Sequence, residues 1–185
     1  MLETIQRPVA ELSQSLSRLR AGDGSTAEVV QWLRAVNSIA STVPVPAMCD
    51  PHRGYSRTLL HKSDLFEILV LHWTAGCASA IHDHGGAHCW FAVSQGTMKI
   101  ENYLRYDAGN VPGFARIGLE GREELDSGAI DYRQDDVHLH RCVAGDGGVT
   151  TLHVYARPIE RFHTFDERAQ RCFDVTSTYD AIMSA

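Results

Sequence analysis

From Phe66 onward the sequence is a succession of short segments rich in β-branched and aromatic residues, and this feature limits the fold more than any other. Turn-forming residues separate the segments, as in the stretches 107–113 and 144–148. Many short strands joined by such turns predict an all-β sandwich or barrel. Strands are expected at 66–73, 88–94, 97–106, 129–134, 137–143 and 151–156.

The first forty or so residues have helical periodicity instead. Ser25 and Glu28 have the spacing of a capping box, and apolar residues follow them at helical intervals. An earlier helix is expected over Ala10–Arg20, with Pro8 at its entrance. Three prolines between residues 44 and 51 then end the helical pattern.

Length and charge restrict the organisation and the partners. The 185 residues are the length of one domain, so we expect a single domain, 1–185, with a helical segment, 1–45, packed on the β part. The net charge of −6, without a run of Lys and Arg, argues against nucleic acid or a membrane surface as partner. We expect a monomer or a weak homo-oligomer.

The cysteine pattern and the first residues indicate the compartment. The five cysteines are an odd number and include no C-x-x-C pair, which fits a reducing environment better than a disulfide framework. The N-terminal stretch lacks the basic start and apolar region of a signal peptide. We therefore expect a cytoplasmic protein.

Two histidine pairs mark the candidate site. His82 and His84 are separated by one residue, so in an extended segment both side chains lie on the same face. His138 and His140 repeat this spacing on another expected strand, and His153 lies on the next. A lone histidine is most often an ordinary hydrogen-bonded residue, but two such pairs on separate strands predict a metal site.

The spacing around the first pair resembles a known motif. The segment Gly76–Gly96 matches the first motif of the cupin superfamily, with Cys89 where that motif normally has glutamate. His140 represents the second motif, and the resemblance implies a cupin-type β-barrel or jelly roll. Without the glutamate, three neutral imidazoles remain, and this ligand set suits Fe(II), Zn(II), Ni(II) or Cu(II) alike.

Longer segments resemble the thiol dioxygenases and, among them, the cysteine dioxygenases. The matches follow the order of that family from about Tyr55 to Tyr179. They are Gly54–Arg57, Ile81–His84 with Cys89, Leu139–Arg141, Thr151–Pro158 and Phe162–Arg168.

The resemblance implies a metal centre and a reaction. His82, His84 and His140 would hold Fe(II) and leave three coordination positions open. The partners would be a small thiol, bound as thiolate, and O2. Transfer of both oxygen atoms to sulfur would give a sulfinic acid, and the resemblance favours L-cysteine as the thiol.

The resemblance also implies roles around the metal. Arg57 would bind the substrate carboxylate in a charge-assisted contact, with Tyr55 lining the same pocket. Tyr155 would place its hydroxyl near the iron, and His153 and Thr151, on the same face of the strand, would orient it as a relay. In the family, a cysteine at the position of Cys89 forms a thioether with the tyrosine, here Tyr155.

The sequence departs from the family pattern at three places. Thr151 stands where the relay usually has serine, which preserves the hydroxyl. His138 replaces a small residue and competes with His140 as the third ligand. Arg157 replaces a proline associated with a cis peptide bond, which predicts an altered pocket around Arg57 with a second cation near it.

Other functions remain open on these residues. A dioxygenase of 3-mercaptopropionate usually has glutamine at the position of Arg57, whereas a second cation from Arg157 would suit a dicarboxylate thiol such as mercaptosuccinate. A different metal-binding cupin enzyme would keep the motif glutamate and would need neither Tyr155 nor Cys89. A non-catalytic cupin often loses its ligand histidines.

Overall fold

The computed structural model describes residues 2–47, 53–134 and 138–183, with side chains from residue 6 onward. The helical elements are α1 (Leu2–Ala21), α2 (Thr26–Val36) and the 3-10 helix η1 (Asn37–Thr42). The strands are β1 (Tyr55–Lys62), β2 (Glu67–Trp73), β3 (Ile81–His82), β4 (His88–Gln95), β5 (Thr97–Arg105), β6 (Ile117–Asp126), β7 (Ile130–Arg133), β8 (His138–Ala144), β9 (Val149–Ala156), β10 (Arg161–Asp166), β11 (Arg171–Thr176) and β12 (Ala181–Ile182).

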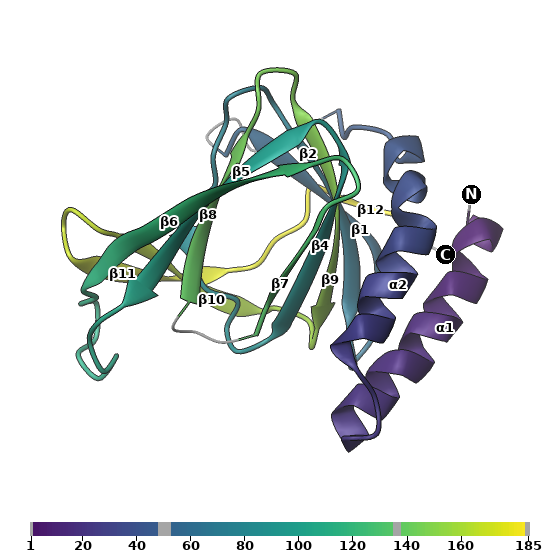
Figure 1. Cartoon of the computed structure of the whole chain (residues 1–185), viewed down its shortest axis with the longest axis horizontal. Coiled ribbons are helices and arrows are strands. Elements are labelled where there is room, and N and C mark those ends of the chain that lie inside the picture. Colours follow the sequence, from purple (N-terminus) through teal and green to yellow (C-terminus); the bar gives the residue numbers. More distant parts are fainter. Residues whose placement is uncertain (1, 48–52, 135–137, 184–185) are drawn as a thin grey trace.

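The strands form two six-stranded sheets. The first has the order β12-β1-β2-β9-β4-β7 and the second the order β11-β10-β3-β8-β5-β6. In Figure 1, α1 and α2 lie beside the first sheet, and β5, β6, β8, β10 and β11 lie on its opposite side. The expectation of a strand-rich fold is confirmed, since the six expected strands correspond to β2, β4, β5, β7, β8 and β9.

The remaining strands were not expected from the sequence. In β6, most residues are exposed or half-buried, because the strand lies at the edge of the second sheet. An edge strand with little buried surface has no clear alternation of apolar and polar residues. The strand β3 has two residues, which is too short for a periodic pattern.

The expected start of the first helix is wrong. The helix α1 begins at Leu2, and Pro8 lies inside it instead of at its entrance. The Pro8 carbonyl accepts a hydrogen bond of 2.6 Å from Nε1 of Trp32, which ties α1 to α2. The second helix begins as expected, because Ser25 is its N-cap and its hydroxyl accepts a hydrogen bond from the Ala27 amide.

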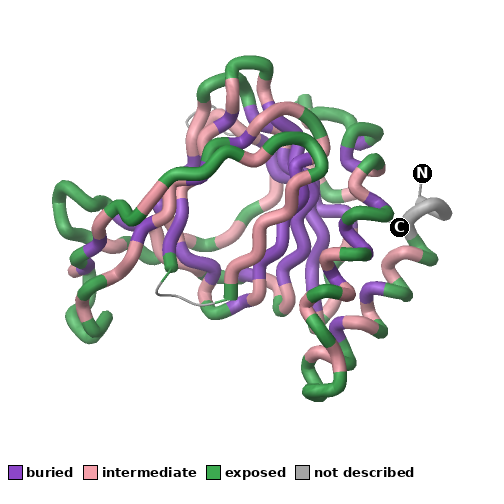
Figure 2. Tube along the Cα trace, in the orientation of Figure 1, coloured by how far each residue is buried: buried purple, intermediate pink, exposed green. Residues whose placement is uncertain are grey.

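Strand β4 shows how the first sheet is buried on both faces. Trp90 and Ala92 belong to a hydrophobic cluster that includes Leu33 of α2, so one face of the sheet packs on the helices. The burial map agrees, since the strands next to α2 are largely buried (Figure 2). Tyr132 of β7 packs against the same cluster.

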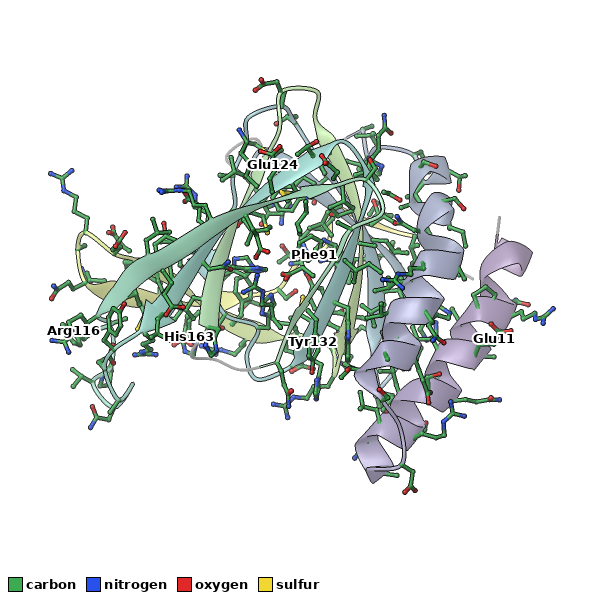
Figure 3. The ribbon with its side chains drawn as sticks, in the orientation of Figure 1. Glu11, Phe91, Arg116, Glu124, Tyr132 and His163 are labelled. Carbon is green, nitrogen blue, oxygen red and sulfur yellow. The ribbon has the colours of Figure 1, made fainter. Side chains whose placement is uncertain are left out.

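The other face of the first sheet is turned toward the second sheet. Phe91 of β4 shares a second hydrophobic cluster with Met98 and Ile100 of β5, and Figure 3 shows it in the space between the sheets. Residues of β2, β4, β7 and β9 that alternate with the helix-facing ones therefore point into the interior. This interior face carries the candidate site.

Candidate metal centre

Three histidines meet between the sheets. His82 of β3 is paired directly with His140 of β8, and His84 follows two residues after His82. One ring nitrogen of each lies within 4.8 Å of the corresponding atoms of the other two. The structure therefore brings together the three side chains that the sequence nominated as metal ligands.

A glycine turns the chain directly after the second histidine. Gly85 has φ +59°, and a Cβ atom there would lie 2.4 Å from the carbonyl oxygen of Arg161. A larger residue would therefore push the segment away from the neighbouring strand β10. The glycine therefore allows a tight turn directly after His84, whose side chain is buried.

Burial keeps the three imidazoles neutral. Burial, together with the neighbouring His140, lowers the pKa of His82 to about 3. Burial also lowers the pKa values of His84 and His140, and Asp131 partly opposes the shift at His140. A neutral imidazole offers a free lone pair, which is the form that binds a metal ion.

The donor set fits a divalent transition metal. Nδ1 of His82 is 2.9 Å from the carbonyl oxygen of Ala80, so its Nε2 is left for an ion. Nδ1 of His84 is buried without a hydrogen-bond partner among the described residues. Three convergent, neutral nitrogen donors suit Fe(II) and its neighbours in the first transition row. The competing His138 is exposed and lies outside this described cluster.

A hydrogen-bonded row of side chains runs along β9 beside the histidines. The Thr151 hydroxyl lies 2.8 Å from Nε2 of His153, and the Tyr155 hydroxyl lies 3.0 Å from Nδ1 of the same ring. The indole N–H of Trp73 donates to the Thr151 hydroxyl at 2.9 Å. Trp73 was not nominated from the sequence, since only the pairing of β2 with β9 brings it there.

Cys89 and Tyr155 are direct neighbours across the sheet. They are opposite each other in the antiparallel pairing of β4 with β9, and both side chains are buried in the cluster between the sheets. Directly opposite residues in such a pair have Cβ atoms about 4.5–5.5 Å apart. The thiol therefore lies within reach of the phenol ring.

A cavity of about 410 Å³ joins these groups to Arg57 and Tyr55. Arg57 is 8% exposed, and its guanidinium carbon lies 5.8 Å from the ring centroid of Tyr179. Among the described residues, no carboxylate lies within ion-pair distance of this guanidinium. The ring of Tyr55 stacks on Trp73 with centroids 4.2 Å apart. The cavity is thus lined both by the three histidines and by a guanidinium without a carboxylate partner among the described residues.

Comparison with known proteins identifies the family. Residues 3–168 match the family model described as "Cysteine dioxygenase type I". The chain belongs to this family. "Cysteine dioxygenase type 1" of Rattus norvegicus is 31% identical over 94% of this chain and 86% of its own length, and that of Homo sapiens is 29% identical over the same shares.

Family membership makes the chain an oxidoreductase of the dioxygenase class. Among solved structures, KdgF from Halomonas sp. superposes with a TM-score of 0.46 and 14% identity over 60% of this chain and 84% of its own. None of the described helices has the length and apolar character needed to cross a membrane.

The structure contradicts the expectation that Arg157 alters the pocket around Arg57 and places a second cation there. The Ala156–Arg157 peptide bond is cis although the family proline is missing. The Arg157 side chain is exposed, contacts the Gly85 carbonyl at 3.4 Å and does not line the cavity. The second cation near Arg57 is Arg53, and Asp180 neutralises it at 2.6 Å.

Two residues near the C-terminus, Tyr179 and Asp180, hold Arg57 in position, and no pattern in the sequence indicates these contacts. Asp180 also accepts a hydrogen bond of 2.7 Å from the backbone amide of Arg57. The Tyr179 hydroxyl donates to the buried carboxylate of Glu67, which fixes the ring against the guanidinium. More than a hundred residues separate these partners in sequence, so no local signal links them.

Proposed function

We propose that this protein is an Fe(II)-dependent thiol dioxygenase that converts L-cysteine and O2 into cysteine sulfinic acid. The balance is simple, since RSH and O2 give RSO2H with both oxygen atoms on sulfur. The observation that carries the proposal is one cavity lined by three neutral histidines and an arginine without a carboxylate partner. We also propose that the two sheets form a cupin-type jelly roll with the helices packed on one face.

In this proposal His82, His84 and His140 hold the iron. When bound, iron supplies the redox chemistry that lets O2 react with a thiol, which it does not do readily by itself. Three neutral ligands would leave the positive charge of the ion uncompensated, so the cavity would favour an anionic thiolate over a neutral thiol. Arg57 binds the substrate carboxylate in a two-point contact and so orients the sulfur toward the histidines.

Tyr155 acts as a hydrogen-bond donor in the cavity. Burial raises the pKa of its phenol well above the ordinary value, so the hydroxyl keeps its proton. If His153 carries its proton on Nδ1, it donates to the Tyr155 oxygen, and the phenol O–H is free to donate to the substrate. Thr151 then donates to Nε2 of His153 and fixes this tautomer, while Trp73 donates to Thr151.

We also propose that Cys89 and Tyr155 become linked by a thioether during turnover. The thiol S–H and one ring C–H bond break and an S–C bond forms, while two protons and two electrons pass to O2 and reduce it to H2O2. Such a link fixes the phenol before substrate binds and reduces the entropic cost of ordering it.

The thioether can be tested by intact mass. After turnover with L-cysteine and O2, the iron-loaded protein should lose the mass of two hydrogen atoms, and Cys89→Ser should not. Cys142→Ser is the matched control, because Cys142 is also buried and lines the same cavity but is not opposite Tyr155. A fully active wild-type protein that never loses this mass would refute the link.

Oxygen uptake tests the function itself. The Fe(II)-loaded protein should consume O2 and form sulfinate in a one-to-one ratio, with L-cysteine faster than 3-mercaptopropionate or mercaptosuccinate. The one unneutralised arginine in the cavity matches a thiol with one carboxylate, which disfavours mercaptosuccinate. Between the two monocarboxylates, L-cysteine is expected to be faster because 3-mercaptopropionate dioxygenases usually have glutamine at the position of Arg57. Faster turnover of another thiol would change the substrate but keep the chemistry, and no uptake with any of them would refute the dioxygenase proposal.

A further inference from the structure

A charged pair lies between the sheets next to the histidines. Asp131 and Arg133 of β7 are directly opposite Phe91 and Cys89 of β4, and opposite residues share one face of a sheet. Because Phe91 and Cys89 belong to the cluster between the sheets, Asp131 and Arg133 also point inward. Figure 3 shows Phe91 in this space. Their side chains are only 12% and 13% exposed.

The two charges are held by specific contacts. Nε of Arg133 donates to Oδ2 of Asp131 at 2.8 Å, and its Nη2 contacts Glu123 at 3.2 Å. Removing two charges from water is costly, and their mutual attraction often only offsets this cost. Stability alone therefore does not explain why this ion pair is buried.

The carboxylate approaches one of the three histidines. Oδ2 of Asp131 lies 3.7 Å from Nδ1 of His140. This nitrogen is buried and has no hydrogen-bond partner among the described residues, so the carboxylate approaches it without a bond in this structure. The same nitrogen of His82 faces the backbone carbonyl of Ala80 instead. Of the three ring systems, His140 is the one whose outer nitrogen faces a carboxylate.

The carboxylate faces the histidines as one half of an ion pair. Its Oδ2 lies 2.8 Å from Nε of Arg133. The cluster of three histidines therefore has the negatively charged Asp131 carboxylate beside it, although the histidines themselves are neutral.

We propose that Asp131 is a positioning residue for the metal ligand His140, orienting its imidazole and strengthening it as a donor through Nδ1. Carboxylates that accept a hydrogen bond from the outer nitrogen of a ligand histidine have this effect in other metal sites. Asp131 supplies, from the neighbouring strand, negative charge that the motif lacks with Cys89 in place of glutamate. Arg133 holds the carboxylate in place. This inference rests on the metal site of the proposed function.

Iron affinity and redox potential test the role. Asp131→Asn keeps the shape but removes the charge, and we expect Fe(II) to bind about 10- to 100-fold more weakly in competition with a chromogenic chelator. The Fe(III)/Fe(II) midpoint potential should shift to a more positive value, because less negative charge stabilises the oxidised ion. Asp131→Glu should restore both values toward those of the wild type, which a merely structural loss would not predict.

Two further variants control for the change in net charge and for the buried guanidinium that Asp131→Asn leaves unpaired. Glu124→Gln is the charge-matched control, since Glu124 lies exposed on β6 and does not line the cavity, and it should leave both values unchanged. Asp131→Asn combined with Arg133→Gln avoids an unpaired buried guanidinium and should show the same weaker binding. Wild-type affinity and potential in either Asp131→Asn protein would overturn this inference. Failure of the wild type to bind iron would instead overturn the proposed function.

Discussion

Replacing His140 with alanine should reduce bound iron to background and abolish oxygen uptake with L-cysteine. His140 contributes one of the three convergent nitrogen donors and is 2% exposed, so no water-exposed neighbour can readily take its place. Losing an outer partner of a ligand costs about 10- to 100-fold in metal affinity, so losing the ligand itself should cost more than about 100-fold. Metal analysis after desalting and oxygen-electrode assays measure both effects.

The matched control is His138→Ala, two residues earlier on the same strand. His138 is exposed and outside the described cluster, so this variant should retain wild-type iron content and most of the activity. Circular dichroism of both apo-proteins checks that the strand still folds. Retained iron in His140→Ala, together with its loss in His138→Ala, would reverse the choice of the third ligand.

Replacing Arg57 with glutamine should raise the KM for L-cysteine by about 10- to 100-fold. A hydrogen bond to a charged group contributes about 1.5–3 kcal/mol, and 1.4 kcal/mol corresponds to a factor of ten. The effect should be large here because Arg57 is buried and has no competing carboxylate partner among the described residues. Steady-state oxygen uptake at varied L-cysteine measures it, and iron content should stay at the wild-type value.

A thiol without a carboxylate distinguishes a loss of carboxylate binding from general damage to the pocket. The KM for 2-aminoethanethiol should be the same in Arg57→Gln and in the wild type, since this compound offers nothing for the guanidinium to bind. If the KM for L-cysteine were also unchanged, Arg57 would not be the carboxylate-binding residue. A general loss with both thiols would point to a disturbed pocket, for instance through the contact with Tyr179.

Local patterns in the sequence predicted which side chains of the site share a face, whereas the choice of His140 and the roles of Arg57 and Cys89 came from the resemblance to the family. Alternation along a strand is a property of neighbouring residues, so the spacing of His82 with His84 and of Thr151, His153 and Tyr155 indicated side chains on one face. The structure has these relations, with the relay atoms at hydrogen-bond distance. The six strands with a clear apolar pattern were likewise predicted, because their burial repeats along the chain.

Tertiary structure alone decided which distant residues support those parts. Asp131 faces His140 because β7 and β8 belong to opposite sheets, and Asp180 reaches Arg57 because β12 pairs with β1. Neither contact produces a periodic pattern of residues in the sequence. The same holds for the exclusion of Arg157 from the cavity. Periodicity fixes the face on which a side chain lies, whereas the register and packing of strands far apart in the chain fix what that face meets.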